Sequence, residues 1–167
     1  MSSASGTVSD NDLMKRIASG DRAAVRLLFM RHHSRVCRFA ARQTGSDNMA
    51  DDIANEVFLE VWRKAGTFEF RSEVSTWLLG IARFKILSAR RKRKEDELDD
   101  LQAERMEDTG DTPEVVSMKL DKAAALRQCI DGLSDEHSAV IDLAYYHGRT
   151  VTEIGEILAI PVATVKT

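Results

Sequence analysis

A strongly acidic stretch in the middle of the chain limits what the sequence can fold into. Residues 95–111, EDELDDLQAERMEDTGD, hold nine acidic residues against one arginine. The stretch offers almost no apolar side chain to bury, which is typical of a solvated linker rather than a core element. The sequence therefore predicts two small domains, residues 1–94 and 114–167, joined by a flexible acidic linker at 95–113.

Both halves carry the apolar periodicity of helices, with buried positions recurring at three- and four-residue steps. Proline occurs only twice and glycine nine times, so few residues that end helices or favour strands and turns are present. The first expected helix opens at Ser9 and ends by Gly20, the second ends at Gly45, the third is capped by Ser46, and the fourth runs from Thr76 to Lys94. Further helices are expected near 114–131, 135–147, 150–159 and 162–167. These patterns predict an all-α fold.

Several classes of protein lack support. No apolar run is long enough to span a bilayer, and the polar start MSSASGTVSDND does not resemble a signal peptide, so we expect a cytosolic protein. Cys37 and Cys129 lie far apart, which fits reduced thiols better than a disulfide framework. His33 and Cys37 lie four apart, a spacing that suits metal ligands, but zinc sites usually need three or four ligands. No phosphate-binding or hydrolytic motif occurs, and we expect no catalysis, metal or cofactor.

The end of the fourth expected helix is strongly basic. Residues 83–94, RFKILSARRKRK, carry seven lysines or arginines and no acid. A phosphate backbone would offset the repulsion among these charges, whereas the alternative is an ordinary solvated helix end. Trp77, Phe84, Phe68 and Phe70 add rings on which unstacked bases could lie, although core packing is equally expected for Trp77. The acidic linker either screens this helix or serves as a tether.

The last segment, TVTEIGEILAIPVATVKT, has the pattern of a helix–turn–helix. Val151, Ile154 and Ile157 share one helix face, and Pro161 stands where a second helix would begin. In such motifs the second helix enters the major groove of DNA, although short helical hairpins also serve structural roles. The chain ends at Thr167, within that second helix, so we expect it to read duplex DNA poorly.

Two long motifs resemble one family. LSDEHSAVIDLAYYHGRTVTEIGEILAIPVATVKT resembles the C-terminal promoter-reading domain of bacterial extracytoplasmic-function sigma factors, group IV of the sigma-70 family. MADDIANEVFLEVWRKAGTFEFRSEVSTWLLGIAR resembles their N-terminal domain, and STWLLGIAR is the more specific part. The resemblance covers residues 20–94 and 120–167. It implies a protein that binds core RNA polymerase, directs it to promoters and helps to melt the DNA, with no catalysis of its own.

The resemblance also assigns roles to three sets of residues. Those expected to bind the clamp helices of the largest polymerase subunit are Asp51, Asp52, Asn55, Glu56, Leu59 and Trp62. Those expected at the -10 element are Phe70, Arg71, Ser75, Thr76, Trp77, Arg83, Lys85, Arg90 and Arg91. Those expected at the -35 element are Arg149, Thr152, Thr164, Lys166 and Thr167. Without the resemblance, the first set would be interpreted as a solvated acidic helix face.

Four positions depart from the usual pattern of the family. Asn55 stands where glutamine is more common, Phe84 where asparagine is, Ser88 where aspartate is, and Ser134 where proline is. The family further implies an anti-sigma factor that covers the DNA-binding and polymerase-binding surfaces. The opening VSDNDLMKRIASGDRAAV is similar to alphaproteobacterial members that answer oxidative stress, whose anti-sigma factors can bind zinc. The main alternative is a helix–turn–helix repressor that binds duplex DNA as a dimer, which would leave STWLLGIAR unexplained.

Overall fold

The computed structural model describes residues 6–103 and 132–166, and every regular element in these ranges is helical. The all-α prediction is confirmed for this part of the chain. The expected helix at 114–131 lies outside the described residues. The elements are α1 (Asp10–Ala18), α2 (Arg22–Thr44), α3 (Asp47–Lys64), the 3-10 turn η1 (Ala65–Thr67), α4 (Val74–Ala103), α6 (Asp135–Tyr145), α7 (Val151–Leu158) and α8 (Val162–Lys166).

Local capping chemistry sets the ends of the first three helices. The Ser9 hydroxyl accepts a hydrogen bond from the backbone N–H of Asp12 at 3.1 Å and starts α1. The Asp21 carboxylate caps α2 by accepting from two backbone N–H groups. Gly45, with φ of 70°, ends α2, and Ser46 caps α3. The starts at Ser9 and Ser46 and the end at Gly45 are thus confirmed.

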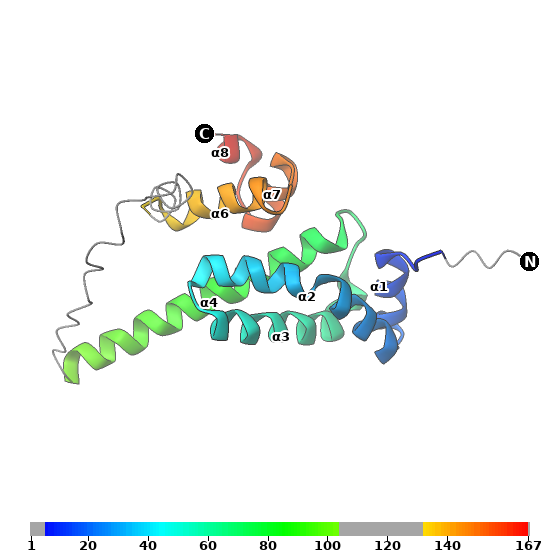
Figure 1. The fold of residues 1–167 in the computed structure, drawn as a ribbon, viewed down its shortest axis with the longest axis horizontal. Coiled ribbons are helices and arrows are strands. Elements are labelled where there is room, and N and C mark those ends of the chain that lie inside the picture. Colours follow the sequence, from blue (N-terminus) through cyan, green and yellow to red (C-terminus); the bar gives the residue numbers. More distant parts are fainter. Residues whose placement is uncertain (1–5, 104–131, 167) are drawn as a thin grey trace, which may run out of the picture.

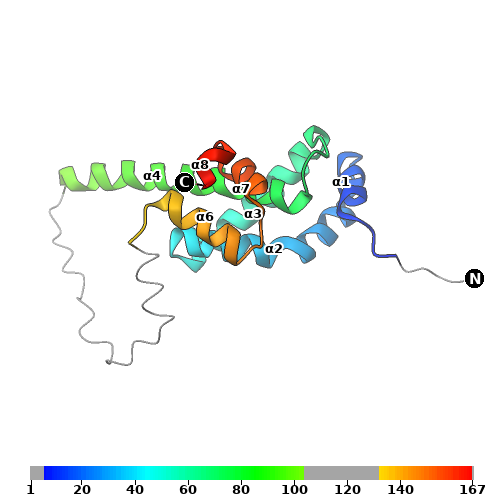
Figure 2. The ribbon, with the colours of Figure 1, turned by 90° about the horizontal axis from the view of Figure 1, so that it is seen from above.

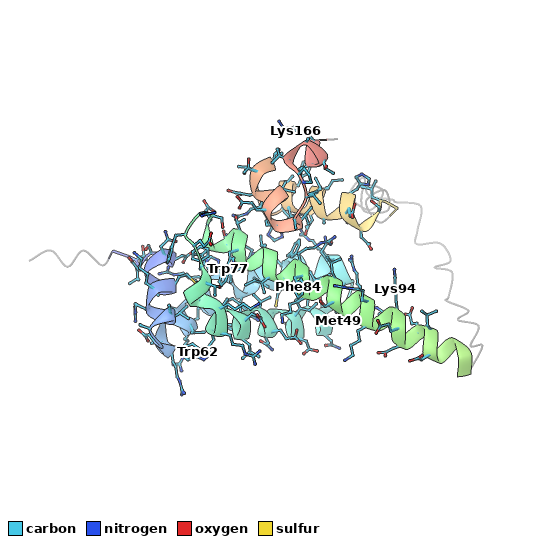
Figure 3. All side chains as sticks on the ribbon, turned by 180° about the vertical axis from the view of Figure 1, so that it is seen from behind. Met49, Trp62, Trp77, Phe84, Lys94 and Lys166 are labelled. Carbon is cyan, nitrogen blue, oxygen red and sulfur yellow. The ribbon has the colours of Figure 1, made fainter. Side chains whose placement is uncertain are left out.

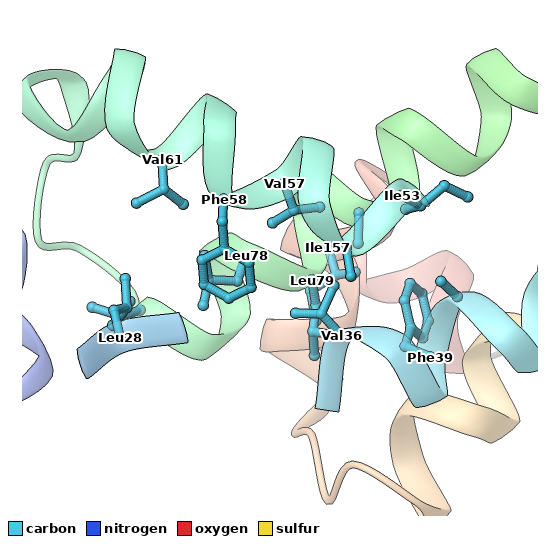
Figure 4. Close-up of a cluster of buried hydrophobic side chains, with 14 of the residues drawn as sticks. Leu28, Val36, Phe39, Ile53, Val57, Phe58, Val61, Leu78, Leu79 and Ile157 are labelled. Atoms are coloured by element: carbon cyan, nitrogen blue, oxygen red, sulfur yellow. The ribbon is translucent and has the colours of Figure 1, made fainter. Parts of the chain in front are cut away.

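The core of the N-terminal unit, α1 to α4, is a set of aliphatic and aromatic side chains from all four helices. Figure 4 shows Val36 and Phe39 of α2 facing Val57 of α3 and Leu79 of α4. All four are at most 1% exposed. Burying such a side chain contributes about 1.5–3 kcal/mol, so this cluster dominates the stability of the unit. Packing of these side chains also fixes which face of α3 is exposed to solvent.

Helix α4 is longer than the sequence indicates. It continues past Lys94 to Ala103, so the first part of the acidic stretch is helical and the predicted helix end at Lys94 is wrong. Opposite charges four residues apart contribute about 0.2–0.5 kcal/mol to a helix, and Arg93 Nε lies 3.4 Å from Glu97 Oε1 in this part of α4. Figures 1 and 2 show the last turns of α4 projecting beyond the other helices. No described helix is long and apolar enough to cross a membrane.

The C-terminal unit, α6 to α8, contains the expected helix–turn–helix. A reciprocal capping box between Thr150 and Glu153 starts α7. Ala159, with φ of 55°, ends α7, and the turn is tight because a Cβ on Gly155 would lie 3.0 Å from the Ile160 carbonyl oxygen. Helix α8 follows directly after Pro161.

The two units pack against each other, a relation that the sequence left open. Helix α7 lies on α4, and α6 lies on α2. The side chain of Ile157 in α7 reaches the core cluster beside Leu79 and Val36 (Figure 4). Arg42 of α2 donates to the Asp142 carboxylate of α6 at 2.9 Å and lies over the Tyr146 ring. The chain therefore has a closed arrangement in which both apolar and polar contacts join the units.

Candidate polymerase and nucleic-acid interfaces

The outer face of α3 is a mixed acidic and apolar surface. All six residues assigned to polymerase binding are exposed, because Ile53, Ala54, Val57, Phe58 and Val61 occupy the inward stripe of the helix. Leu59 is 55% exposed and Trp62 is 40% exposed. Large apolar side chains beside carboxylates at the surface are typical of a protein-binding patch with an apolar anchor. The geometry is thus compatible with the assigned role, which remains a prediction.

The loop before α4 holds an aromatic side chain in a strained conformation. Phe70 has φ of 59°, a region that bulky residues rarely adopt and that costs on the order of 1–3 kcal/mol. Its ring is 42% exposed and meets Phe68 edge-on at 4.8 Å. Trp77 lies against Phe68 at 5.0 Å and is half-buried, so it takes part in packing. Arg71, at the tip of the loop, is exposed and pairs with Glu69.

Residues assigned to the two promoter elements meet in one hydrogen-bond network. The Arg149 guanidinium donates to Ser75 Oγ at 2.9 Å, to Glu73 Oε2 at 3.1 Å and to Thr76 Oγ1 at 3.4 Å. Ser75 and Thr76 are at most 6% exposed, and the Arg149 side chain is 9% exposed. In the closed arrangement Arg149, Ser75 and Thr76 are hydrogen-bonded to one another and buried, so their side chains are not accessible to DNA.

The basic residues of α4 divide into two groups. Arg83 is 6% exposed and donates to Gln43 Oε1 at 3.3 Å, and burial together with nearby Arg90 lowers its pKa. Lys85 pairs with Glu60, and Arg90 donates to the Gln43 carbonyl oxygen and pairs with Asp135. These contacts hold the three cations to the protein. By contrast, Arg91, Lys92, Arg93 and Lys94 are exposed.

The remaining residues assigned to the -35 element lie on the outside of the C-terminal unit. Thr152 of α7 and Thr164 and Lys166 of α8 are exposed, whereas Thr167 lies outside the described residues. Figure 3 shows Lys166 and Trp62 on opposite edges of the molecule. The surfaces assigned to DNA reading and to polymerase binding therefore do not overlap at these positions.

Sequence reasoning missed a buried polar group that joins the units. Burial raises the pKa of Asp142, although Arg42 partly offsets this effect. Burial, reinforced by Arg42 and Arg149, lowers the pKa of His147 to about 4. His147 Nε2 lies 3.7 Å from Asp142 Oδ2, too far for a hydrogen bond, so the imidazole is neutral rather than ion-paired near neutral pH. An aspartate beside the apolar residues Ala139 and Leu143 of α6 was the available signal.

Comparison with known proteins agrees with this architecture. The family description Sigma-70 region 2 matches residues 28–95, and Sigma-70, region 4 matches residues 129–167. The chain is 31% identical over 163 residues to the ECF RNA polymerase sigma factor SigW of Bacillus subtilis, covering 92% of this chain and 87% of SigW. It is 27% identical over 157 residues to SigK of Mycobacterium tuberculosis, covering 92% of this chain and 84% of SigK.

Two solved structures share the fold. RpoE in complex with the anti-sigma factor NepR, from Bartonella quintana, has a TM-score of 0.65 at 22% identity, covering 84% of this chain and 86% of RpoE. CnrH in complex with the cytosolic domain of CnrY has a TM-score of 0.65 at 22% identity, covering 94% of this chain and 87% of CnrH. Sigma-70 regions 2 and 4 in this order define a bacterial transcription initiation factor. Within that class the chain belongs to the extracytoplasmic-function sigma factors.

Proposed function

We propose that this sigma factor binds the clamp helices of core RNA polymerase through the outer face of α3. This proposal is supported chiefly by the exposure of all six assigned side chains on a helix whose other face is buried in the core. Carboxylates such as Asp52 and Glu56 orient the encounter, while Leu59 supplies an apolar anchor. This role requires no catalytic step and implies action in the cytosol, where the polymerase acts.

We assign the reading of the -10 element to residues within 1–94 and the reading of the -35 element to residues within 114–167, with 95–113 as the linker. The strained, exposed Phe70 supports a role for its loop in capturing an unstacked base, which costs a few kcal/mol. Elements centred at -10 and -35 lie roughly 25 base pairs apart, or about 85 Å along B-form DNA. Two units in contact cannot span that distance, so the closed arrangement has to open on the promoter.

An anti-sigma factor is the expected regulator. The similar RpoE chain was solved with the anti-sigma factor NepR, which supports such a partner for this chain. A groove between α4 and α7 is lined by the apolar side chains of Trp77, Ile81, Phe84, Leu87 and Leu158. Phe84 is 62% exposed there, at a position where the family usually has a polar residue. We assign this groove to an apolar segment of the anti-sigma factor.

Reversing one charge tests the polymerase interface. We expect Glu56→Lys to weaken binding to core RNA polymerase by about 2 kcal/mol, or roughly thirtyfold, because a cation would replace an orienting carboxylate. Co-elution with purified core polymerase over a range of protein concentrations measures this change.

The matched control is Glu97→Lys, which makes the same charge change on the projecting end of α4. This control should bind like the unaltered chain. Equal binding by both variants would remove α3 from the interface. Failure of the unaltered chain to bind polymerase would instead favour the helix–turn–helix repressor.

The exposed basic residues of α4 are expected to contribute to the salt dependence of promoter binding. Arg91 is free to reach phosphate, whereas Arg90 is held by Gln43 and Asp135. We expect Arg91→Ala to weaken promoter binding by the holoenzyme about equally across promoter sequences and to reduce the slope of log K against log salt by about 1. Arg22→Ala, an exposed arginine at the start of α2, is the control and should leave the slope unchanged. An unaltered slope for Arg91→Ala would show that this helix end is merely solvated.

A further inference from the structure

Helices α2 and α3 bring three potential metal ligands together at the surface of the N-terminal unit. His33 and Cys37 lie one turn apart on α2, and Asp51 reaches them from the first turns of α3. Cys37 Sγ lies 3.6 Å from His33 Nε2 and 3.4 Å from Asp51 Oδ1. The ligand atoms of all three side chains lie within 4.8 Å of one another. The sequence shows the His–Cys pair but not the third member, because only the helix packing supplies Asp51.

The two distances from Cys37 Sγ are close to those between neighbouring ligand atoms around one tetrahedral metal ion. Zinc lies about 2.3 Å from a thiolate sulfur, about 2.0 Å from an imidazole nitrogen and about 2.1 Å from a carboxylate oxygen. At tetrahedral angles, the sulfur is then about 3.5–3.6 Å from each of the other two ligand atoms. The distance from Cys37 Sγ to His33 Nε2, 3.6 Å, has this value, and the distance to Asp51 Oδ1, 3.4 Å, lies close to it. The helices therefore need not move, but the His33 ring, whose Nδ1 lies 4.0 Å from the sulfur, has to turn so that Nε2 faces the ion.

We propose that His33, Cys37 and Asp51 form a binding site for a divalent transition-metal cation of the zinc type, with the fourth position open to water. A thiolate, an imidazole and a carboxylate together suit zinc, whereas magnesium and calcium prefer oxygen ligands alone. The site is accessible, because Asp51 is exposed and the other two side chains are half-buried. It lies outside the DNA-reading surfaces.

Binding of the ion would displace one hydrogen from the site. The Cys37 thiol donates this hydrogen to Asp51 Oδ1 at 3.4 Å. The entering cation replaces that hydrogen between sulfur and carboxylate, and the proton leaves to solvent. The Phe29 ring lies against the His33 ring, with 4.3 Å between centroids and an interplanar angle of 32°. The ion would fasten α2 to α3 and neutralise one carboxylate of the proposed polymerase face.

Metal titration of the whole chain, without polymerase, tests this site independently of the proposed function. The reduced, metal-free protein is titrated with cobalt(II), a spectroscopic substitute for zinc, and the bound cobalt is then displaced with zinc. We expect a thiolate-to-cobalt charge-transfer absorption that saturates at a single equivalent. Cys37→Ser should abolish it, and Cys129→Ser should retain it. His33→Gln and Asp51→Asn should each weaken cobalt binding by at least about tenfold, while Asp52→Asn should not.

Two results would overturn the proposal. One is the absence of the absorption from the unaltered chain, and the other is an absorption that disappears with Cys129→Ser and survives Cys37→Ser. A second measurement covers the possibility that a ligand variant folds poorly. Zinc should raise the thermal unfolding temperature of the unaltered chain and of Cys129→Ser, because a ligand that binds only the folded state stabilises it, and it should not do so for Cys37→Ser.

Discussion

The substitution Ile157→Asp is expected to separate the C-terminal unit from the N-terminal unit while leaving both helical. Ile157 is 3% exposed and lies among core residues of the N-terminal unit, including Leu79 and Val36 (Figure 4). Its backbone also approaches α4 closely, since a Cβ on Gly80 would lie 4.0 Å from the Ile157 Cα. Losing the isoleucine side chain costs about 2–5 kcal/mol, and burying an unpaired carboxylate adds several more. Opening the contact avoids both penalties.

Small-angle X-ray scattering measures the separation, and far-ultraviolet circular dichroism checks the helix content. We expect a larger radius of gyration for Ile157→Asp with nearly unchanged helicity. Thr152→Asp is the matched control, because Thr152 lies on the exposed side of the same helix. The control should remain compact. A compact Ile157→Asp protein would show that the aspartate finds a partner in the interface, and a general loss of helicity would show that the two units do not fold separately.

The separation matters for function because the closed arrangement uses residues assigned to DNA. Ser75 and Thr76 are buried beneath Arg149, and all three would become free when the units part. A protein whose binding-competent state is a minor population shows an affinity reduced by that fraction. If these residues bind DNA as proposed, we expect closure of the two units to lower the apparent affinity for promoter DNA until polymerase, or the DNA itself, supplies the free energy of opening.

Much of the fold could be predicted because it depends on neighbours along the chain. Ser9 and Ser46 cap helices through groups three residues away, and the outer face of α3 follows from helical periodicity alone. The predicted helix ended too early, at Lys94, because the residues that follow offer almost no apolar side chains to a core. Favourable charge spacing, as between Arg93 and Glu97, supports a helix without a core.

The contacts between the units could not be predicted from sequence. Arg149 is separated from Ser75 by 74 residues, and Arg42 from Asp142 by 100. No local pattern encodes such a pairing, since the relevant information is the shape of two assembled surfaces. For the same reason the third ligand of the proposed metal site, Asp51, became apparent only once α2 and α3 were packed. The exposed positions on α3 were easier to predict, because they depend on the periodicity of one helix and not on contacts between helices.

Acidification is expected to weaken the contact between the units through His147. Its side chain is 5% exposed and meets Phe39 edge-on at 5.7 Å, with several arginines nearby. Burial lowers the pKa of His147 from 6.5 to about 4, so the opened or unfolded protein binds a proton more readily than the closed one. Between these two pH values, stability therefore rises with pH and is lost as pH falls. Over the whole window the loss is about 3 kcal/mol.

Asp142 acts in the opposite direction at the acidic end. Burial raises its pKa above 3.8, so protonation of this carboxyl favours the closed form and offsets part of the loss. The effect of His147 is therefore measured by comparing variants that all retain Asp142. From pH 7.5 to pH 5.5, we expect the unaltered chain to lose about 1 kcal/mol of unfolding free energy through His147.

Urea unfolding at these two pH values measures that loss in matched variants. His147→Gln removes the titrating group and should lose about 1 kcal/mol less than the unaltered chain over the same pH range. His137→Gln removes an exposed histidine at the start of α6 and should behave like the unaltered chain. His32, whose pKa burial also lowers, is present in all three proteins, so its contribution cancels in the comparison. An equal pH dependence in all three would show that His147 reaches solvent in the closed form, and the packing of α6 on α2 would then be looser than the contact between Arg42 and Asp142 indicates.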